Sequence, residues 1–142
     1  HSRRAQIVTW NPLVDGTHHE PPCLQNLWCR VVPADVKDEY LLEMNTHWRS
    51  RDGFKAAFMN MFAFTEWQKQ MAERLSEMTG RRINPGRYID VSNSFHLYGS
   101  YVRLGEIERF LAAVEKKDST GGTAPQAVWV QIAAAKAALA GD

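Results

Sequence analysis

The chain has 142 residues, 44% of them hydrophobic and 23% charged, and its formal net charge is +1. This is the composition of a globular domain, and it excludes collagen-like and wholly disordered chains. The near-neutral charge gives no reason to expect a nucleic-acid polymer or an anionic membrane as partner. No apolar run suits a transmembrane helix or a signal peptide, and two cysteines are too few for a disulfide scaffold. We expect one cytoplasmic domain with free thiols.

Alternating hydrophobicity predicts three strands in the first third of the chain, at 6–10, 23–32 and 40–48. The third strand alternates best. One of its faces carries Leu42, Met44, Thr46 and Trp48, and the other carries Glu43, Asn45 and His47.

A long helix is expected over 53–78, closed by Gly80. Its first half is so rich in Phe and Met that we expect it to be buried on all sides. The later elements are a turn at 84–86, a strand over 88–101, an amphipathic helix over 104–116, a linker over 117–125 and an Ala-rich helix over 126–140.

This order of strands and helices indicates an α+β fold. We place the domain at 1–116 and the linker at 117–125, and the C-terminal Ala-rich segment spans 126–142.

Cys23 directly follows two prolines, which fix the backbone at the start of a strand. A nucleophilic cysteine needs its thiolate stabilised by nearby positive charge, and the alternative is a small buried hydrophobe. We interpret Cys29, in mid-strand, as buried. His18 and His19 lack a standard zinc spacing to these cysteines, so no metal site is expected.

The segment Arg49-Ser50-Arg51-Asp52 joins the third strand to the long helix. Arginines, a serine hydroxyl and a helix N-terminus together suit a phosphate or a carboxylate. The alternative is a helix cap in which Asp52 does the capping and the arginines are solvated.

Two further places combine polar groups with apolar surroundings. Asn60 lies in the most apolar part of the chain, so a buried amide there either bonds to local backbone or reads a ligand, such as a pyrimidine edge. Strand alternation places Ser94, His96 and Tyr98 on one face. They would suit a sugar hydroxyl, or form a solvated strand face.

Taken in this order, these residues resemble the thymidylate synthase family, including its pyrimidine-nucleotide hydroxymethylases. The resemblance spans roughly residues 2–111 and the C-terminal part of that family's catalytic domain, a mixed sheet packed against a long central helix. The segments that carry it are Ser2-Arg3-Arg4 with Trp10-Asn11, Pro22-Cys23, Arg49-Ser50-Arg51-Asp52, Asn60 eight residues after Asp52, and His96-Leu97-Tyr98.

The resemblance implies a role for each matching residue. Cys23 would be the nucleophile that adds to C6 of the pyrimidine, with Asp52 ordering the base and Asn60 hydrogen-bonding its edge. The other substrate-binding residues would be Arg49 and Ser50 on the phosphate, His96 and Tyr98 on the deoxyribose hydroxyl, and Arg3 and Arg4 on the phosphate of the partner subunit in a homodimer.

The implied reaction is C5 methylation of a pyrimidine nucleoside 5′-monophosphate with 5,10-methylenetetrahydrofolate. The amide of Asn60 favours uracil, hence dUMP to dTMP. Hydroxymethylation of dUMP, dCMP or CMP is one alternative, and a non-catalytic nucleotide-binding or dimerisation module is another.

The chain departs from the family at several places. Asn93-Ser94 replaces Gly-Asp, Ala57-Phe58-Met59 replaces Leu-Pro-Phe, and Leu24 follows the cysteine where His is frequent. Nothing matches the family's N-terminal half, so we expect the chain to be a C-terminal piece.

Overall fold

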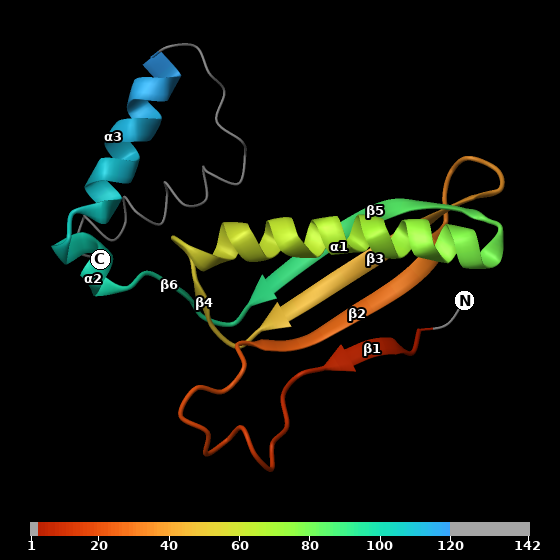
Figure 1. Ribbon diagram of the computed structural model, residues 1–142, viewed down its shortest axis with the longest axis horizontal. Coiled ribbons are helices and arrows are strands. Elements are labelled where there is room, and N and C mark those ends of the chain that lie inside the picture. Colours follow the sequence, from red (N-terminus) through yellow and green to blue (C-terminus); the bar gives the residue numbers. More distant parts are fainter. Residues whose placement is uncertain (1–2, 120–142) are drawn as a thin grey trace. The chain divides into compact units, whose positions relative to one another are not determined.

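The structure is a computed structural model that describes residues 3–119. The described chain divides into two compact units: unit 1 comprises 3–51 and 59–94, and unit 2 comprises 52–58 and 95–119. The expected α+β class, with a mixed sheet and a long helix, is confirmed. In chain order the elements are β1 (Ala5–Val8), β2 (Leu24–Pro33), β3 (Glu39–Trp48), β4 (Arg51–Asp52), α1 (Ala56–Thr79), β5 (Arg82–Ser92), β6 (Phe95–His96), α2 (Gly99–Arg103) and α3 (Glu106–Ser119) (Figure 1).

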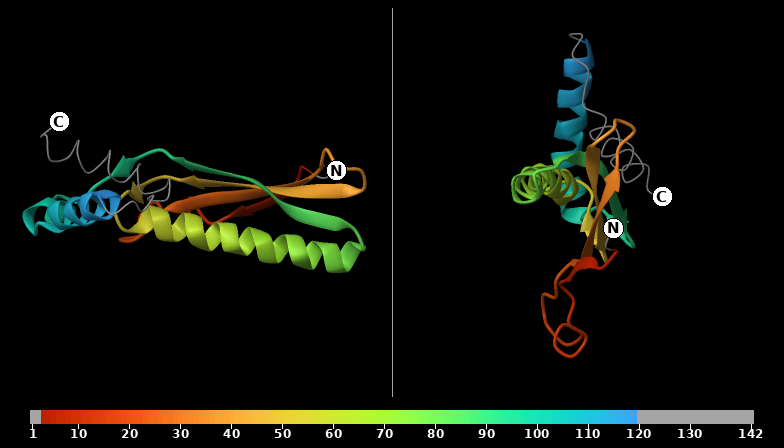
Figure 2. Two further views of the ribbon diagram at one scale, coloured as in Figure 1. Left: turned by 90° about the horizontal axis from the view of Figure 1, so that it is seen from above. Right: turned by 90° about the vertical axis from the view of Figure 1, so that its right-hand side faces the viewer.

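The main sheet has the strand order β1-β2-β3-β5. The first three strands are antiparallel neighbours, whereas β3 and β5 are parallel. Parallel neighbours cannot be joined by a hairpin and need a crossover, which α1 provides. Figure 2 shows α1 lying along one face of this sheet.

The predicted alternation of β3 is confirmed. Leu42, Met44, Thr46 and Trp48 are all buried, while the residues between them are only partly so. The register places Cys29 of β2 opposite Met44, on the face that α1 covers. Ala72 of α1 and Ile83 of β5 complete the core, so the core is the layer between the sheet and α1.

The long helix begins at Ala56, three residues later than predicted, and ends as expected at Gly80, whose φ is +67°. Complete burial of its first half is wrong: Met59 is 62% exposed and Phe62 57% exposed. The reason is that the sheet covers one side of a helix only. Within residues 3–119, no helix combines the length and the apolar character that crossing a membrane requires.

The turn expected at 84–86 is also wrong, because these residues lie within β5. The ladder with β3 is irregular between Leu42 and Met44. A Cβ on Gly86 would come 3.1 Å from the Leu42 carbonyl oxygen, so the two strands approach closely here. The buried Gln68 amide on α1 donates to that same carbonyl at 2.6 Å. A side chain of α1 thus supplies the hydrogen bond at the place where the ladder is disturbed.

The single strand predicted over 88–101 is wrong as well. β5 ends at Ser92, the short β6 follows, and α2 begins at Gly99. The first strand ends at Val8, two residues early. The helix predicted over 104–116 runs from Glu106 to Ser119, so it includes the start of the expected linker. The rest of that linker and the Ala-rich helix lie outside the described residues.

Replacing Gln68 by Leu should lower the free energy of unfolding by about 1–3 kcal/mol, because the buried Leu42 carbonyl loses its donor. Gln70→Leu on the exposed side of α1 is the matched control and should stay within about 0.5 kcal/mol of the parent chain. Urea unfolding measures both variants. Equal effects of the two substitutions would contradict the role given to Gln68.

Candidate functional site

Cys23 is an exposed thiol in the loop that leads into β2. Arg49, directly after β3, holds this loop: its Nη2 donates to the Pro21 carbonyl at 2.8 Å and its Nε to the Pro22 carbonyl at 3.1 Å. The Arg49 amide also donates to the Cys23 carbonyl at 2.9 Å. The cysteine and the arginine that the sequence singled out are therefore neighbours in unit 1.

Ser50 joins this group. Its hydroxyl oxygen lies 3.7 Å from the Cys23 sulfur and accepts a hydrogen bond from Arg49 Nη1 at 3.4 Å. A guanidinium has five N–H donors, and its three contacts leave two of them for a ligand. The group thus combines an accessible thiol, a fixed positive charge and a hydroxyl, which are the surroundings typical of reactive cysteines.

Arg51 is buried, with only 3% of its surface exposed. Its guanidinium donates two hydrogen bonds to the Asp90 carboxylate of β5, at 2.5 and 2.8 Å, and lies 4.1 Å from the centre of the Trp48 ring. The hydroxyls of Tyr88 and Thr46 also donate to Asp90. Burial lowers the pKa of Arg51, and the Asp90 charge opposes that shift. Burial likewise raises the pKa of Tyr88.

In segment 49–52, Asp52 caps the turn over 53–55 that leads into α1, which begins at Ala56. Asp52 Oδ1 accepts hydrogen bonds from the amides of Phe54 at 2.9 Å and Lys55 at 3.2 Å. The alternative in which both arginines are solvated is wrong, because Arg51 is buried and Arg49 is half-buried. The two arginines have different roles: one fixes the end of β5 and the other fixes the Cys23 loop.

Asp52, His96 and Tyr98 belong to unit 2. The rings of His96 and Tyr98 meet edge to face with centroids 5.0 Å apart. They lie together as predicted, although only His96 is in a strand, and Tyr98 is the N-cap residue of α2. The other oxygen of Asp52 accepts a hydrogen bond from Tyr101 at 2.7 Å. Tyr101 also packs against Tyr98, with ring centroids 5.7 Å apart.

Asn60 is half-buried in the first turns of α1, not fully buried as expected. Helical spacing places it on the same side as Ala57 and Phe64, toward the sheet. Its side-chain amide has no hydrogen-bond partner among residues 3–119. Of the two alternatives left open by the sequence, local backbone bonding is thus not seen in the described chain, and contact with a ligand stays a prediction.

Arg3 and Arg4 precede β1 and are exposed. The antiparallel register pairs Ala5 with Cys29 and Val8 with Asn26, so the two arginines lie toward the end of β2 that is remote from Cys23. The six residues from Cys23 to Cys29 span about 20 Å of extended chain. That exceeds the reach of an arginine side chain, so neither arginine serves the Cys23 loop of its own chain.

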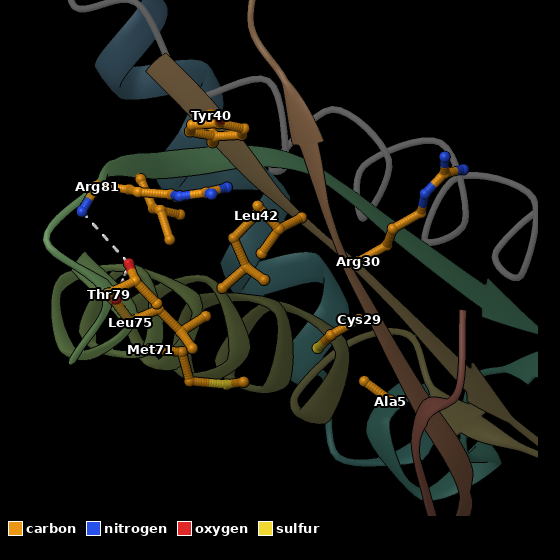
Figure 3. A pocket seen from close by; sticks show the side chains of 11 residues that line it. Ala5, Cys29, Arg30, Tyr40, Leu42, Met71, Leu75, Thr79 and Arg81 are labelled. Carbon is orange, nitrogen blue, oxygen red and sulfur yellow. Dashed lines mark hydrogen bonds between the residues drawn. The ribbon is translucent and has the colours of Figure 1, made fainter. Parts of the chain in front are cut away.

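An open pocket of about 800 Å³ lies elsewhere in unit 1, beside the second half of α1 (Figure 3). Leu42, Met71 and Leu75 contribute to its largely apolar lining, and the Arg81 guanidinium stacks 5.1 Å from the centre of the Tyr40 ring. None of the predicted site residues lines it. Its one thiol is Cys29, which is buried as predicted and whose pKa is raised by that burial. The pocket is therefore separate from the candidate chemistry.

The contacts of Tyr101 and the Arg51–Asp90 ion pair were not predicted from the sequence. Tyr101 follows Tyr98 by three residues, a spacing that puts side chains on opposite faces of a strand but on the same side of a helical turn. Because the segment was predicted to be a strand, the contact between Tyr98 and Tyr101 was not expected. In the described part of the chain, no three His, Cys, Asp or Glu residues are grouped so that they could hold a metal ion.

No family model matches the chain, and no curated protein matches it in sequence. Its function therefore has to be inferred from the site and from the residues that carry the resemblance.

Replacing Asp90 alone by Ala should destabilise the protein by about 3–5 kcal/mol, because it leaves the buried Arg51 charge unpaired. The double variant Arg51→Met/Asp90→Leu should lose much less, since both charges disappear together. Urea unfolding of Asp90→Ala measures the single loss, and urea unfolding of Arg51→Met, of Asp90→Leu and of the double variant measures this coupling. Additive losses would mean that the pair does not act as a unit.

Proposed function

We propose that the chain acts in one-carbon transfer to C5 of a pyrimidine nucleoside 5′-monophosphate, with dUMP to dTMP as the preferred reaction. It would form the C-terminal part of a thymidylate synthase-like catalytic domain. The observation that carries the proposal is the exposed Cys23 thiol beside Arg49 and Ser50, with the Cys23 Sγ 3.7 Å from the Ser50 Oγ. Two cysteines without a disulfide suit a reducing compartment such as the cytoplasm.

The chemistry follows from these residues. The Cys23 thiolate adds to C6 of the pyrimidine ring, forming an S–C6 bond and moving the electron pair of the C5–C6 double bond onto C5 and the C4 carbonyl. C5 thereby becomes a nucleophile, and one inaccessible step is divided into two accessible ones. The two remaining donors of Arg49, together with Ser50, bind the phosphate. A tightly held phosphate keeps the ring beside the thiol.

The resemblance implies that the rest of the nucleotide is recognised by Asn60, Asp52, His96 and Tyr98. The Asn60 amide, unpartnered among the described residues, offers a donor and an acceptor to the edge of uracil. His96 and Tyr98 bind the sugar hydroxyl, and Asp52 helps to order the base.

5,10-Methylenetetrahydrofolate would supply the one-carbon unit as an electrophilic methylene group. No residue between 3 and 119 has been assigned to hold it, so the chain's own contribution is activation of C5. The mass of the product distinguishes a methyl from a hydroxymethyl substituent.

We further propose that the functional form is a homodimer in which Arg3 and Arg4 bind the phosphate in the partner's site. The strand register supports this, because it carries both arginines away from the Cys23 loop of their own chain.

The first test is tritium release from C5-labelled dUMP, dCMP, UMP and CMP, with and without methylenetetrahydrofolate, on the chain and on any longer product of its gene. Release from one nucleotide is expected, and the product's mass then separates methylation from hydroxymethylation. Cys23→Ser should abolish release while nucleotide affinity is retained, since the thiol forms the covalent bond. Tight nucleotide binding by such a longer product without any release would favour the non-catalytic module instead.

Arg49→Ala should weaken nucleotide binding by about ten-fold or more, because a charge-assisted hydrogen bond to phosphate is lost. Arg74→Ala, a surface arginine of α1 paired with Glu77, is the matched control and should leave the dissociation constant unchanged. Isothermal titration calorimetry with dUMP measures both. An unchanged affinity of the Arg49 variant would remove that residue from the phosphate site.

The dimer assignment predicts complementation between two inactive variants, Arg4→Ala and Cys23→Ser. A mixed dimer would contain one site with an intact Cys23 and an intact partner Arg4, so random mixing should restore about a quarter of the parent activity. Tritium release after co-refolding measures it. Activity that stays at the level of the separate variants would show that Arg4 does not act across a dimer.

A further inference from the structure

Tyr101 lies in α2, outside the segments that carry the resemblance, yet it contacts several groups of unit 2. Its hydroxyl donates to Asp52 Oδ2 at 2.7 Å. Its ring packs against Phe54, with centroids 5.3 Å apart, and against Tyr98 at 5.7 Å. The Lys55 ammonium lies 4.5 Å from the ring centre. One side chain therefore touches both the acidic residue and the aromatic residue proposed to bind substrate.

The Asp52 carboxylate is held at both oxygens. Oδ1 accepts the amides of Phe54 and Lys55, and Oδ2 accepts the Tyr101 hydroxyl. Each carboxylate oxygen can accept about two hydrogen bonds, so Oδ2 keeps capacity for a ligand N–H or O–H. The hydrogen bond from Tyr101 fixes the plane of the carboxylate, and thus the direction from which Oδ2 can accept a second hydrogen bond.

The ring of Tyr101 is fixed independently of its hydroxyl. Phe54 packs on it and in turn meets Phe110 edge to face at 5.3 Å. Lys55 covers it and is paired with Glu106 at 2.5 Å. The hydrogen bond to Asp52, helped by burial, raises the pKa of Tyr101 to about 12, so the hydroxyl stays a donor at neutral pH. Removing the hydroxyl alone would leave the ring contacts in place.

We infer that Tyr101 is a positioning residue: its hydroxyl orients the Asp52 carboxylate, and its ring orients Tyr98, toward a bound nucleotide. This inference rests on the proposed function for its substrate. It extends that function because no matching segment includes Tyr101.

Tyr101→Phe tests the inference, with Tyr40→Phe as the matched control, because Tyr40 lies in β3 of unit 1 and its ring contact is with Arg81. For the Tyr101 variant we expect kcat for tritium release to fall by about ten-fold or more, as a misplaced catalytic group does. KM for the nucleotide should change less than about two-fold, since phosphate contacts dominate binding. The control should change neither constant.

A double-mutant cycle shows whether Tyr101 affects kcat through Asp52. If Tyr101 acts through Asp52, Tyr101→Phe should add nothing to the loss caused by Asp52→Asn. Additive losses, or an unchanged kcat in Tyr101→Phe, would overturn the inference while leaving the proposed function intact.

Amide hydrogen exchange of Phe54 and Lys55 gives a readout that needs no activity. Both amides are bonded to Asp52, so their exchange should be several-fold faster in Tyr101→Phe, while amides of the core strand β3 are unchanged. If neither the parent chain nor any longer product of its gene releases tritium, the proposed function fails and this measurement decides on Tyr101. Unchanged exchange at both amides would then overturn its role.

Discussion

The parallel pairing of β3 with β5 is the constraint on which the rest of this structure depends. Because parallel strands end at the same edge of a sheet, the register places Trp48, the last residue of β3, beside Ser92, the last residue of β5. Hydrogen bonds reinforce the edge: the Asn93 amide donates to the Trp48 carbonyl at 2.9 Å. Here the chain passes twice from unit 1 into unit 2, after Arg51 and after Ser94. Each passage lies within or beside a segment that the sequence marked as a candidate site.

Two buried polar side chains hold this arrangement in register. Gln68 reaches from α1 to the irregular part of the β3–β5 ladder, and Arg51 joins the segment after β3 to Asp90 near the end of β5. The Arg51–Asp90 pair is not required simply to fill the core, since apolar residues of similar volume are frequently as stabilising as a buried ion pair. Both contacts form only in one register of β3 and β5, because a shift of one residue would move the acceptor out of reach. They favour a single alignment of the strands that carry the candidate site.

In unit 1, the side chain that holds the loop of the thiol is also the one proposed to bind the phosphate. Arg49 donates to the carbonyls of Pro21 and Pro22, and so fixes the loop that carries Cys23. In the proposed reaction its remaining donors take the phosphate. Binding of substrate would then order the arginine further and, through it, the nucleophile. In unit 2 the Asp52 carboxylate is likewise fixed at both oxygens before any ligand arrives, so both groups are preorganised.

The sequence predicts those elements whose side chains repeat with a clear period. The alternation of β3 was predicted because one face of this strand is buried and the other is only partly buried. It also singled out Cys23, Arg49, Ser50, Asp52, Asn60, His96 and Tyr98 by residue type and order. Cys23 lies close to Arg49 and Ser50 only in the folded chain, because the segment that separates the thiol from the hydroxyl, 27 positions further on, includes a hairpin that returns the chain to its starting edge.

Where local signals and tertiary contacts competed, the tertiary contacts prevailed. Pro85 and Gly86 read as a turn, but they lie in a strand because pairing with β3 and the Gln68 amide stabilise the extended chain. Arg51 read as solvated, but its charge is buried because Asp90, distant in sequence, neutralises it. Phe62 read as buried, but it is more than half exposed because one sheet covers only one side of α1. Period and residue type are local properties, whereas the partner of a charge and the coverage of a face depend on segments far away in the chain.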